Sequence, residues 1–252
     1  MLLVVDIGNT NIVIGVFDNN LLTHVFRFDT ERKASTEYYI EKISSHIKSE
    51  KTDVNMAILS SVVRSCTMQV VEAIKSCFRI VPLIANECKH DLILDVDDPK
   101  KLGSDILANA IASRELYGKN SIFIDFGTAT VVGLIIEGSK FLGASILPGV
   151  FTSYNALIQN TDLNYYDTSF KSSNMNLFGK NTQDAVMSGM RSIYYYGIKG
   201  VVSDICAKYK GDFTVVVTGG ISNIIKEELD FADIFDPYLT LNGLRFLYNM
   251  NR

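Results

Sequence analysis

Residues 2–17 read LLVVDIGNTNIVIGVF, a polar turn between two apolar runs. Short apolar runs of this kind are typical of buried strands, and Gly8 permits the sharp reversal that joins two of them as a hairpin. Small polar side chains in the turn let backbone N–H groups approach anionic oxygens, and the Asp6 carboxylate can hold a hydrated cation. The turn is therefore a candidate cradle for a phosphate and its metal ion, although D-x-G-N sequences also form ordinary Asx turns.

Residues 121–136 repeat this pattern as SIFIDFGTATVVGLII, close to half the chain length further on. An ungapped alignment pairs Asp6 with Asp125, Gly8 with Gly127, Asn9 with Thr128 and Asn11 with Thr130. The repeat predicts two similar domains, 1–115 and 116–252, that each offer a polar hairpin turn to one cleft. A third element, TVVVTGG at 214–220, ends a strand in Gly219 and Gly220, where the backbone is expected to come close to a neighbour or a ligand.

Apolar periodicity gives the first half the order βββαβαβ. The expected elements are strands at 2–7, 11–17 and 21–28, a helix at 36–48, a strand at 55–63, a helix at 67–77 and a strand at 78–84. In the second half we expect strands near 121–126, 129–136, 140–146, 213–218 and 232–235, with helical segments between them, including one near 221–229. The fold class is therefore α/β, with two duplicated domains, each a mixed five-stranded sheet flanked by helices.

Three polar segments outside the hairpins carry further candidate residues. Asp105 stands at the start of a helix expected over 106–117, where a carboxylate is a common cap, and its place at the domain joint also suits a ligand. Residues 160–178 are polar and aperiodic and predict a long loop or flap. Thr182 opens a long helical stretch and is either its cap or, beside Lys180, part of an anion site.

Composition narrows the function classes. The chain is 47% hydrophobic, enough for a substantial core, and its net charge of −4 argues against a nucleic-acid or membrane surface. We expect no signal peptide and no membrane span. The four cysteines lack C-x-x-C spacing and the three histidines are scattered, which favours reduced thiols over a zinc site or disulfides.

The motifs, in order, resemble the type III pantothenate kinase family of the acetate and sugar kinase and actin superfamily. They are DIGNTN at 6–11, SSVV at 60–63, LGSD at 102–105, ANAI at 108–111, DFGTAT at 125–130, Gly143 through Pro148 and Gly149, GKNT at 179–182, SG at 188–189 and TGG at 218–220. The resemblance implies ribonuclease H-like (actin-like ATPase) domains with a cleft between them. It also implies a cytoplasmic homodimer that phosphorylates pantothenate to 4'-phosphopantothenate with ATP, the first step of coenzyme A biosynthesis.

The resemblance also implies residue roles. The ATP phosphates would be lined by Asp6, Ile7, Gly8, Asn9, Thr10, Asn11, Ile12 and Val13, with Thr128, Gly219 and Gly220 completing the nucleotide site. Asp6 would help to hold Mg²⁺ through the phosphates or water, and Asp125 would bind a monovalent cation, K⁺ or NH4⁺. Pantothenate would be bound by Gly103, Ser104, Asp105 and Ile106 near the dimer interface, with Thr182 from the partner subunit. Asp105 would be the general base.

Two residues depart from the family pattern. Ile106 replaces the arginine of Gly-x-Asp-Arg, which removes a charge-assisted contact typically worth about 1.5–3 kcal/mol, and Val131 replaces a threonine. The lysines expected to supply the missing charge are Lys100, Lys101 or Lys180. Ile106 also motivates an alternative, a non-catalytic or regulatory paralogue that retains the fold and nucleotide binding. A third possibility is a kinase for another small alcohol or sugar, because a fold does not fix a substrate.

Overall fold

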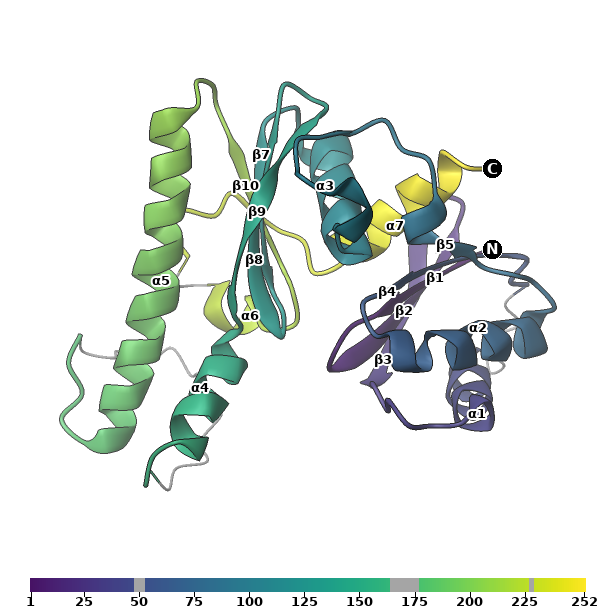
Figure 1. Ribbon diagram of the computed structural model, residues 1–252, viewed down its shortest axis with the longest axis horizontal. Helices are drawn as coiled ribbons and strands as arrows, with labels where there is room; N and C mark the ends of the chain where they lie inside the picture. The colour runs from purple at the N-terminus through teal and green to yellow at the C-terminus, as the bar shows by residue number, and fades with distance from the viewer. Residues whose placement is uncertain (48–52, 164–176, 227–228) are drawn as a thin grey trace. The chain divides into compact units, whose positions relative to one another are not determined.

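The computed structural model describes residues 1–47, 53–163, 177–226 and 229–252, which form two compact units (Figure 1). The first unit comprises Met1–Leu92, Asp97–Ala112 and Leu239–Arg252, and the second comprises Ile93–Val96 and Ser113–Tyr238. Among the described residues, no helix combines the length and the apolar character needed to cross a membrane.

The first unit contains a mixed sheet with the strand order β3-β2-β1-β4-β5 in its described part. Its strands are β1 (Leu2–Ile7), β2 (Asn11–Asp18), β3 (Leu21–Asp29), β4 (Met56–Ser61) and β5 (Leu83–Ile84), with helices α1 (Thr36–Ile47) and α2 (Arg64–Phe78) between them. β1 runs antiparallel to β2 and parallel to β4. The predicted βββαβαβ order of this half is therefore confirmed.

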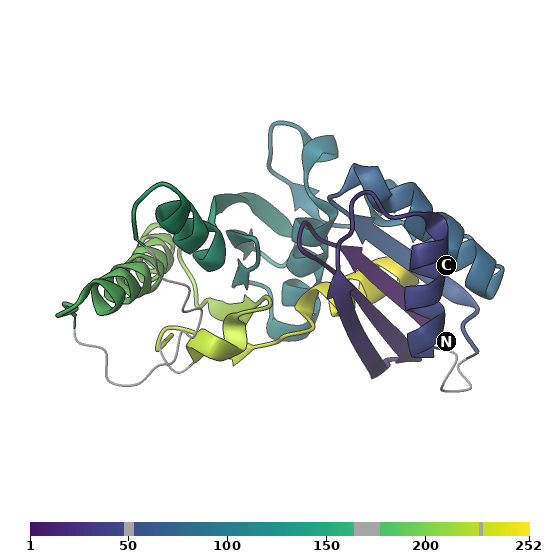
Figure 2. The ribbon, with the colours of Figure 1, turned by 90° about the horizontal axis from the view of Figure 1, so that it is seen from below.

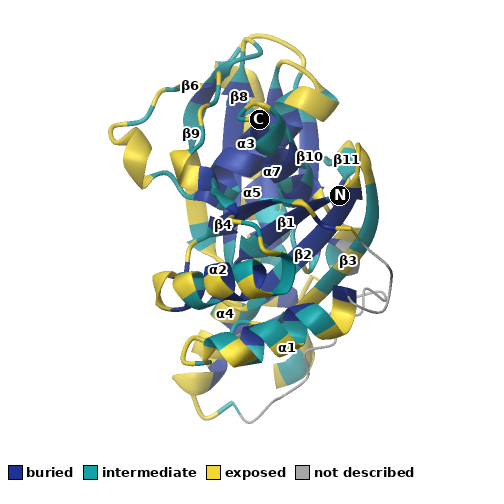
Figure 3. Ribbon diagram, turned by 90° about the vertical axis from the view of Figure 1, so that its right-hand side faces the viewer, coloured by how far each residue is buried: buried dark blue, intermediate teal, exposed yellow. Residues whose placement is uncertain are grey.

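The sheet of the first unit is covered on both faces. Helices α1 and α2 lie on one face, and α7 (Leu239–Asn249) packs against β1 and β4 (Figure 2). Figure 3 shows that β1 and β2 are largely buried, whereas α1 and α2 expose their outer sides. This arrangement follows from the two periodicities of the sequence, because alternate residues of a strand and every third or fourth residue of a helix face the core.

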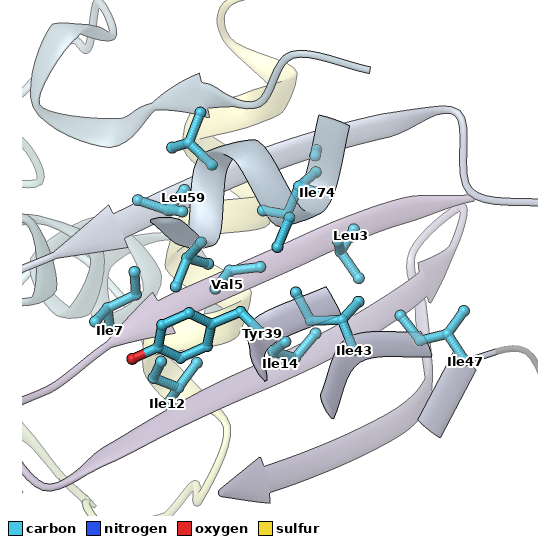
Figure 4. Close-up of a cluster of buried hydrophobic side chains, with 14 of the residues drawn as sticks. Leu3, Val5, Ile7, Ile12, Ile14, Tyr39, Ile43, Ile47, Leu59 and Ile74 are labelled. Atoms are coloured by element: carbon cyan, nitrogen blue, oxygen red, sulfur yellow. The ribbon is translucent and has the colours of Figure 1, made fainter. Parts of the chain in front are cut away.

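The core between the sheet and α1 and α2 is drawn in Figure 4. Its largest contributions are from Leu3, Val5, Ile7, Ile12, Ile14, Tyr39, Ile43, Ile47, Leu59 and Ile74, which are at most 5% exposed. The Tyr39 hydroxyl lies among these apolar groups and donates a hydrogen bond to the Glu31 carbonyl (2.7 Å), so this buried polar group is satisfied.

Three predicted boundaries of the first half need correction. Helix α2 begins at Arg64 and continues through Phe78, so the strand predicted over 78–84 shrinks to Leu83–Ile84. The helix ends at Arg79, whose φ of 60° is left-handed and whose N–H bonds the Lys75 carbonyl. The strand predicted over 55–63 is β4, Met56–Ser61, and the helix predicted over 36–48 ends at Ile47, with residue 48 outside the described residues.

The second unit repeats the arrangement with the strand order β11-β10-β7-β8-β9-β6 in its described part. Its elements are β6 (Ile93–Leu94), β7 (Ser121–Phe126), β8 (Ala129–Ile136), β9 (Lys140–Pro148), α4 (Val150–Gln159), α5 (Thr182–Lys208), β10 (Thr214–Thr218), α6 (Ser222–Ile225) and β11 (Ile234–Phe235). β7 runs antiparallel to β8 and parallel to β10, just as β1 does with β2 and β4. The short edge strand β6 was not predicted.

Two further predicted segments lie partly outside the described residues. The helix expected near 221–229 is represented by Ser222–Ile225, with 227–228 outside the described residues. Most of the flap expected over 160–178 also lies outside them, at 164–176.

Helix α3 (Ser104–Tyr117) and the short helices η2 (Ala85–Glu87) and η3 (Pro99–Lys101) complete the described chain. The domains 1–115 and 116–252 stay a prediction about the duplicated halves, but the compact units differ from them because residues 239–252 lie in the first unit. The reason is the apolar side of α7, where Leu239, Leu241, Leu244 and Leu247 are at most 2% exposed. Gly243 brings the backbone of α7 against Ala108 of α3, since an added Cβ would overlap the Ala108 carbonyl.

Candidate functional site

The first hairpin turn joins β1 to β2, two interior strands of the first sheet, at the end of β1. The Gly8 N–H donates to the Asn11 carbonyl (3.0 Å) and closes the turn, while Asn9 and Thr10 are exposed. An added Cβ at Gly8 would lie 3.1 Å from the Asn11 carbonyl oxygen, so glycine suits this close approach. The exposed tip, with its small polar side chains, fits the donor set expected for a phosphate.

Two residues that follow β3 stabilise this turn by hydrogen bonds. The Thr30 hydroxyl donates to the Gly8 carbonyl (2.7 Å), and the Thr30 N–H donates to the Thr10 carbonyl (2.9 Å). The Arg32 guanidinium donates through Nη2 to the Asn9 side-chain carbonyl (2.7 Å). Sequence reasoning missed both supporting residues, because their role depends on β3 returning alongside the turn.

The other predicted residues of this segment lie inside the sheet. Ile7 and Ile12 pair across the hairpin and are fully buried, so only their backbone is placed to meet a ligand. Val13 lies opposite Asp6 in the same register.

Asp6 is tied to a second strand and to a helix by a chain of serine hydroxyls. Asp6 lies beside Ser60 in the parallel register of β1 and β4, and Ser60 Oγ donates to Asp6 Oδ1 (2.9 Å). Ser60 Oγ lies 2.8 Å from Ser104 Oγ, which also accepts a hydrogen bond from the Ser61 N–H (3.2 Å). Both Ser60 and Ser104 are 1% exposed. Ser60 belongs to the SSVV motif at 60–63, but nothing in the sequence pattern predicted this contact with Asp6.

Asp105 lies in the first turn of α3, directly after Ser104. The Gly103 carbonyl accepts the Leu107 N–H (3.0 Å), so the helix begins two residues earlier than the predicted start at 106. Asp105 Oδ1 accepts the Ile106 N–H (2.8 Å), and an added Cβ at Gly103 would overlap this carboxylate. Glycine therefore leaves room for the acid.

Burial raises the pKa of the Asp105 carboxyl, and hydrogen bonds from the backbone N–H groups of Ile106 and Asp105 offset only part of the rise. A carboxylate with a raised pKa is a stronger proton acceptor than an exposed one, and such groups occur often at catalytic sites. The neighbouring Ile106 side chain is apolar and 9% exposed, so it brings no charge to this place.

The second hairpin turn is one residue shorter than the first. The register pairs Ile7 with Ile12 in the first hairpin and Phe126 with Thr130 in the second. Thr130 therefore corresponds to Ile12, not to Asn11, and the ungapped alignment is wrong beyond the turn.

Two glycines bring other backbone segments against this second turn. An added Cβ at Gly149 would overlap the carbonyl oxygens of Gly127 and Thr128, and the Gly149 N–H donates to the Thr128 carbonyl (2.9 Å). Gly219 has a φ of 98°, and an added Cβ there would lie 2.5 Å from the Phe126 backbone. Of these contacts, only the approach at Gly219 was signalled by the sequence, through its strand-Gly-Gly pattern.

Asp125 lies opposite Thr218 in the parallel register of β7 and β10, as Asp6 lies opposite Ser60. The second unit thus brings Asp125, the turn with Thr128, and Gly219 to neighbouring strand ends, with the exposed Gly220 directly after Gly219. Within the described residues, no group of three His, Cys, Asp or Glu side chains converges to hold a metal ion by itself.

Thr182 is the first residue of α5 but does not cap it. The Asn181 side chain accepts the Asp184 N–H (2.9 Å) and also donates to the Asp184 carboxylate (2.7 Å), so Asn181 is the cap. The alternative that made Thr182 the helix cap is wrong, and its side chain is exposed. Thr182 belongs to the second unit with Asp125, while Asp6 and Asp105 belong to the first.

Comparison with known proteins gives consistent results. A family model described as type III pantothenate kinase matches residues 2–204. The type III pantothenate kinase of Geobacillus kaustophilus is 35% identical over 256 residues, covering 100% of this chain and 98% of that protein. The type III pantothenate kinase of Halalkalibacterium halodurans is 33% identical over 255 residues and covers 100% of both chains.

Solved structures show the same fold at lower identity. A Campylobacter jejuni protein placed in the Baf family of transcriptional activators has a TM-score of 0.62 and 20% identity, over 98% of this chain and 97% of that one. The activator of 2-hydroxyisocaproyl-CoA dehydratase from Clostridium difficile, solved with ADPNP, has a TM-score of 0.58 and 11% identity, over 99% and 94%. Such likeness shows the fold alone, and it confirms the predicted class of two actin-like ATPase domains.

Proposed function

This chain belongs to the type III pantothenate kinase family, which phosphorylates pantothenate with ATP in coenzyme A biosynthesis, and from this premise we propose the residues that carry the reaction. The observation that supports the assignment most is the hydrogen-bonded chain from Asp6 through Ser60 to Ser104, because Asp105 follows Ser104 directly. These hydrogen bonds connect Asp6, next to the phosphate turn, with the start of α3, which bears the proposed base Asp105, and all of these residues belong to the first unit.

On the nucleotide side, we propose that the turn at residues 8–11 binds the ATP phosphates through its backbone N–H groups and small polar side chains. Asp6 supplies one carboxylate for Mg²⁺, whose other ligands come from phosphate oxygens and water, as is usual for this ion. When bound, Mg²⁺ neutralises charge on the transferring phosphoryl group. Thr128, Gly219 and Gly220 complete the nucleotide site, and Asp125 binds K⁺ or NH4⁺.

On the acceptor side, Asp105 takes the proton from the attacking hydroxyl of pantothenate. Its raised pKa suits this role, and the lack of a side chain at Gly103 leaves room for its carboxylate. Ser104 contributes to the pantothenate site by holding the start of α3 in place, since its hydroxyl is already hydrogen-bonded to Ser60 and to the Ser61 N–H. We propose that Gly103 and Ile106, which flank Ser104 and Asp105, also contact pantothenate.

Ile106 leaves the pantothenate carboxylate without the family arginine. The Lys101 ammonium group forms an exposed ion pair with Asp98 (3.2 Å), a weak contact that would have to break before Lys101 could bind pantothenate. Lys100 and Lys180 are both exposed, and we propose that one of them supplies the positive charge.

We further propose a cytoplasmic homodimer in which Thr182 reaches the partner's pantothenate. One side of α5 is buried in its own unit, while Ile193 and Tyr196 are 61% and 58% exposed, which suits a contact with a second copy. Light scattering coupled to size exclusion tests the dimer, and a monomeric mass would overturn it.

The test of the function is an ADP-release assay with pantothenate, Mg²⁺ and K⁺, run on the wild type and on Asp105→Asn. Pantothenate-dependent turnover in the wild type that collapses in the variant supports the proposal. ATP binding without turnover would instead support a regulatory paralogue, the alternative that Ile106 favours. Turnover with another alcohol or sugar, but not pantothenate, would reassign the substrate.

A further inference from the structure

The number of hydroxyl protons determines which group donates and which accepts in each hydrogen bond between Asp6 and the start of α3. A hydroxyl carries a single proton, and Ser60 donates its proton to Asp6 Oδ1. In its contact with Ser104, Ser60 must therefore accept, so Ser104 donates to Ser60. Ser104 in turn accepts from the Ser61 N–H. The hydrogen bonds thus run one way, from the backbone of β4 through Ser104 and Ser60 to the Asp6 carboxylate.

We propose that Ser60 is a positioning residue for phosphoryl transfer, a role that rests on the function proposed above. Ser60 fixes the rotation of the Asp6 carboxylate at the end of β1. Through Ser104, it also holds the first turn of α3, and therefore Asp105, against the end of β4. Ser60 is only 1% exposed and has almost no surface to offer a substrate, so its proposed contribution is geometric.

The two serine hydroxyls are buried, so the effect of removing either of them should not be masked by solvent. Ser60 and Ser104 are both 1% exposed, so water is poorly placed to replace either partner when one hydroxyl is removed. Loss of the Ser60 hydroxyl leaves Asp6 without this donor and Ser104 without its acceptor. The Asp6 carboxylate and the first turn of α3 would then no longer be held together, and a misplacement of about 1 Å costs roughly 100-fold in rate.

The test compares Ser60→Ala, Ser104→Ala and the double variant with Thr240→Val as the matched control. Thr240 also donates a single side-chain hydrogen bond to α3, to Asn109 (2.8 Å), but is not connected to Asp6 through the serine hydroxyls. We expect kcat to fall by about 10- to 100-fold in Ser60→Ala, with the KM for pantothenate changed less than about threefold. Thr240→Val should lose a similar amount in melting temperature but keep its kcat.

A double-mutant cycle separates positioning from general destabilisation. If the hydroxyls act as one unit, the double variant should be no slower than the slower single variant. Ser60→Cys provides a second variant of similar size, and it should be intermediate because a thiol is a weak donor.

The inference is overturned if folded Ser60→Ala keeps the wild-type kcat, if Thr240→Val loses as much kcat, or if the effects of Ser60 and Ser104 simply multiply. Absence of pantothenate turnover in the wild type would be a different result, because it would refute the proposed function itself.

Discussion

Substitution of Gly243 by alanine should destabilise the first unit far more than an ordinary helical Gly→Ala change stabilises a protein. The added Cβ would overlap the carbonyl and Cα of Ala108 on α3, and these backbone atoms cannot rotate away. Overpacking of this kind typically costs 1–3 kcal/mol, or more where backbone must move, against about 1 kcal/mol gained from helix propensity. We therefore expect a net loss of about 2 kcal/mol.

At about 2–4 °C per kcal/mol for a chain of this size, the loss corresponds to a fall in Tm of roughly 4–8 °C. Because Ala108 lies one helical turn after Asp105, a displaced α3 should also lower kcat. Gly197→Ala in α5 is the control, since an added Cβ there meets nothing within 4 Å and should raise Tm slightly. Calorimetry and the ADP-release assay measure both effects. Equal Tm values for the two variants would refute the close packing of α7 on α3.

Three further predictions concern the site. Asp105→Asn should lower kcat by about 10²–10⁴-fold, and the wild-type acid limb of kcat/KM, placed above pH 3.8 by the raised pKa of Asp105, should vanish. Because the folded state holds this proton more tightly than the unfolded state, wild-type stability should fall as the pH rises through the folded pKa. Asp105→Asn should therefore have the higher Tm at pH 7 in calorimetry. Arg32→Ala should raise the KM for ATP about fivefold in steady-state kinetics, because Asn9 loses its donor, and an equal rise in the KM for pantothenate would contradict this assignment. Ile106→Arg should leave the KM for pantothenate within about threefold, because Lys100 or Lys180 already supplies the positive charge, whereas a fall of about tenfold would show that neither lysine replaces the family arginine.

The hairpins and the strand order could be predicted because they depend on local patterns. Short apolar runs on both sides of Gly8 and Gly127 define the two turns without any tertiary information. The strand predicted over 78–84 was too long because this prediction also relied on a local pattern alone. A short, largely apolar segment such as residues 78–84 has no periodicity that separates a strand from the end of a buried helix. Tertiary packing decided that α2 continues to Phe78.

The parts of the site that could not be predicted depend on contacts between distant segments. Ser60 and Ser104 are far apart in sequence, and their hydroxyls meet only because the fold brings the end of β4 next to the start of α3. The one-residue difference between the turns shows in the strand register but not in an ungapped alignment. Likewise, Asn181 and Thr182 are both plausible caps, and only the hydrogen bond to Asp184 distinguishes them.

The return of α7 to the first unit has a consequence for how the protein is made. The sheet that carries Asp6 is synthesised before α7, the helix that covers its second face, because the last strand of the sheet ends at Ile84 and α7 begins at Leu239. At about 5–20 residues per second, the synthesis of the residues between β5 and α7 takes roughly 8–31 s, during which the nascent sheet lacks this cover. Termination before Leu239 should therefore expose Leu2, Val4 and Ile58, residues of β1 and β4, and yield aggregation-prone chains even though both polar turns have been synthesised.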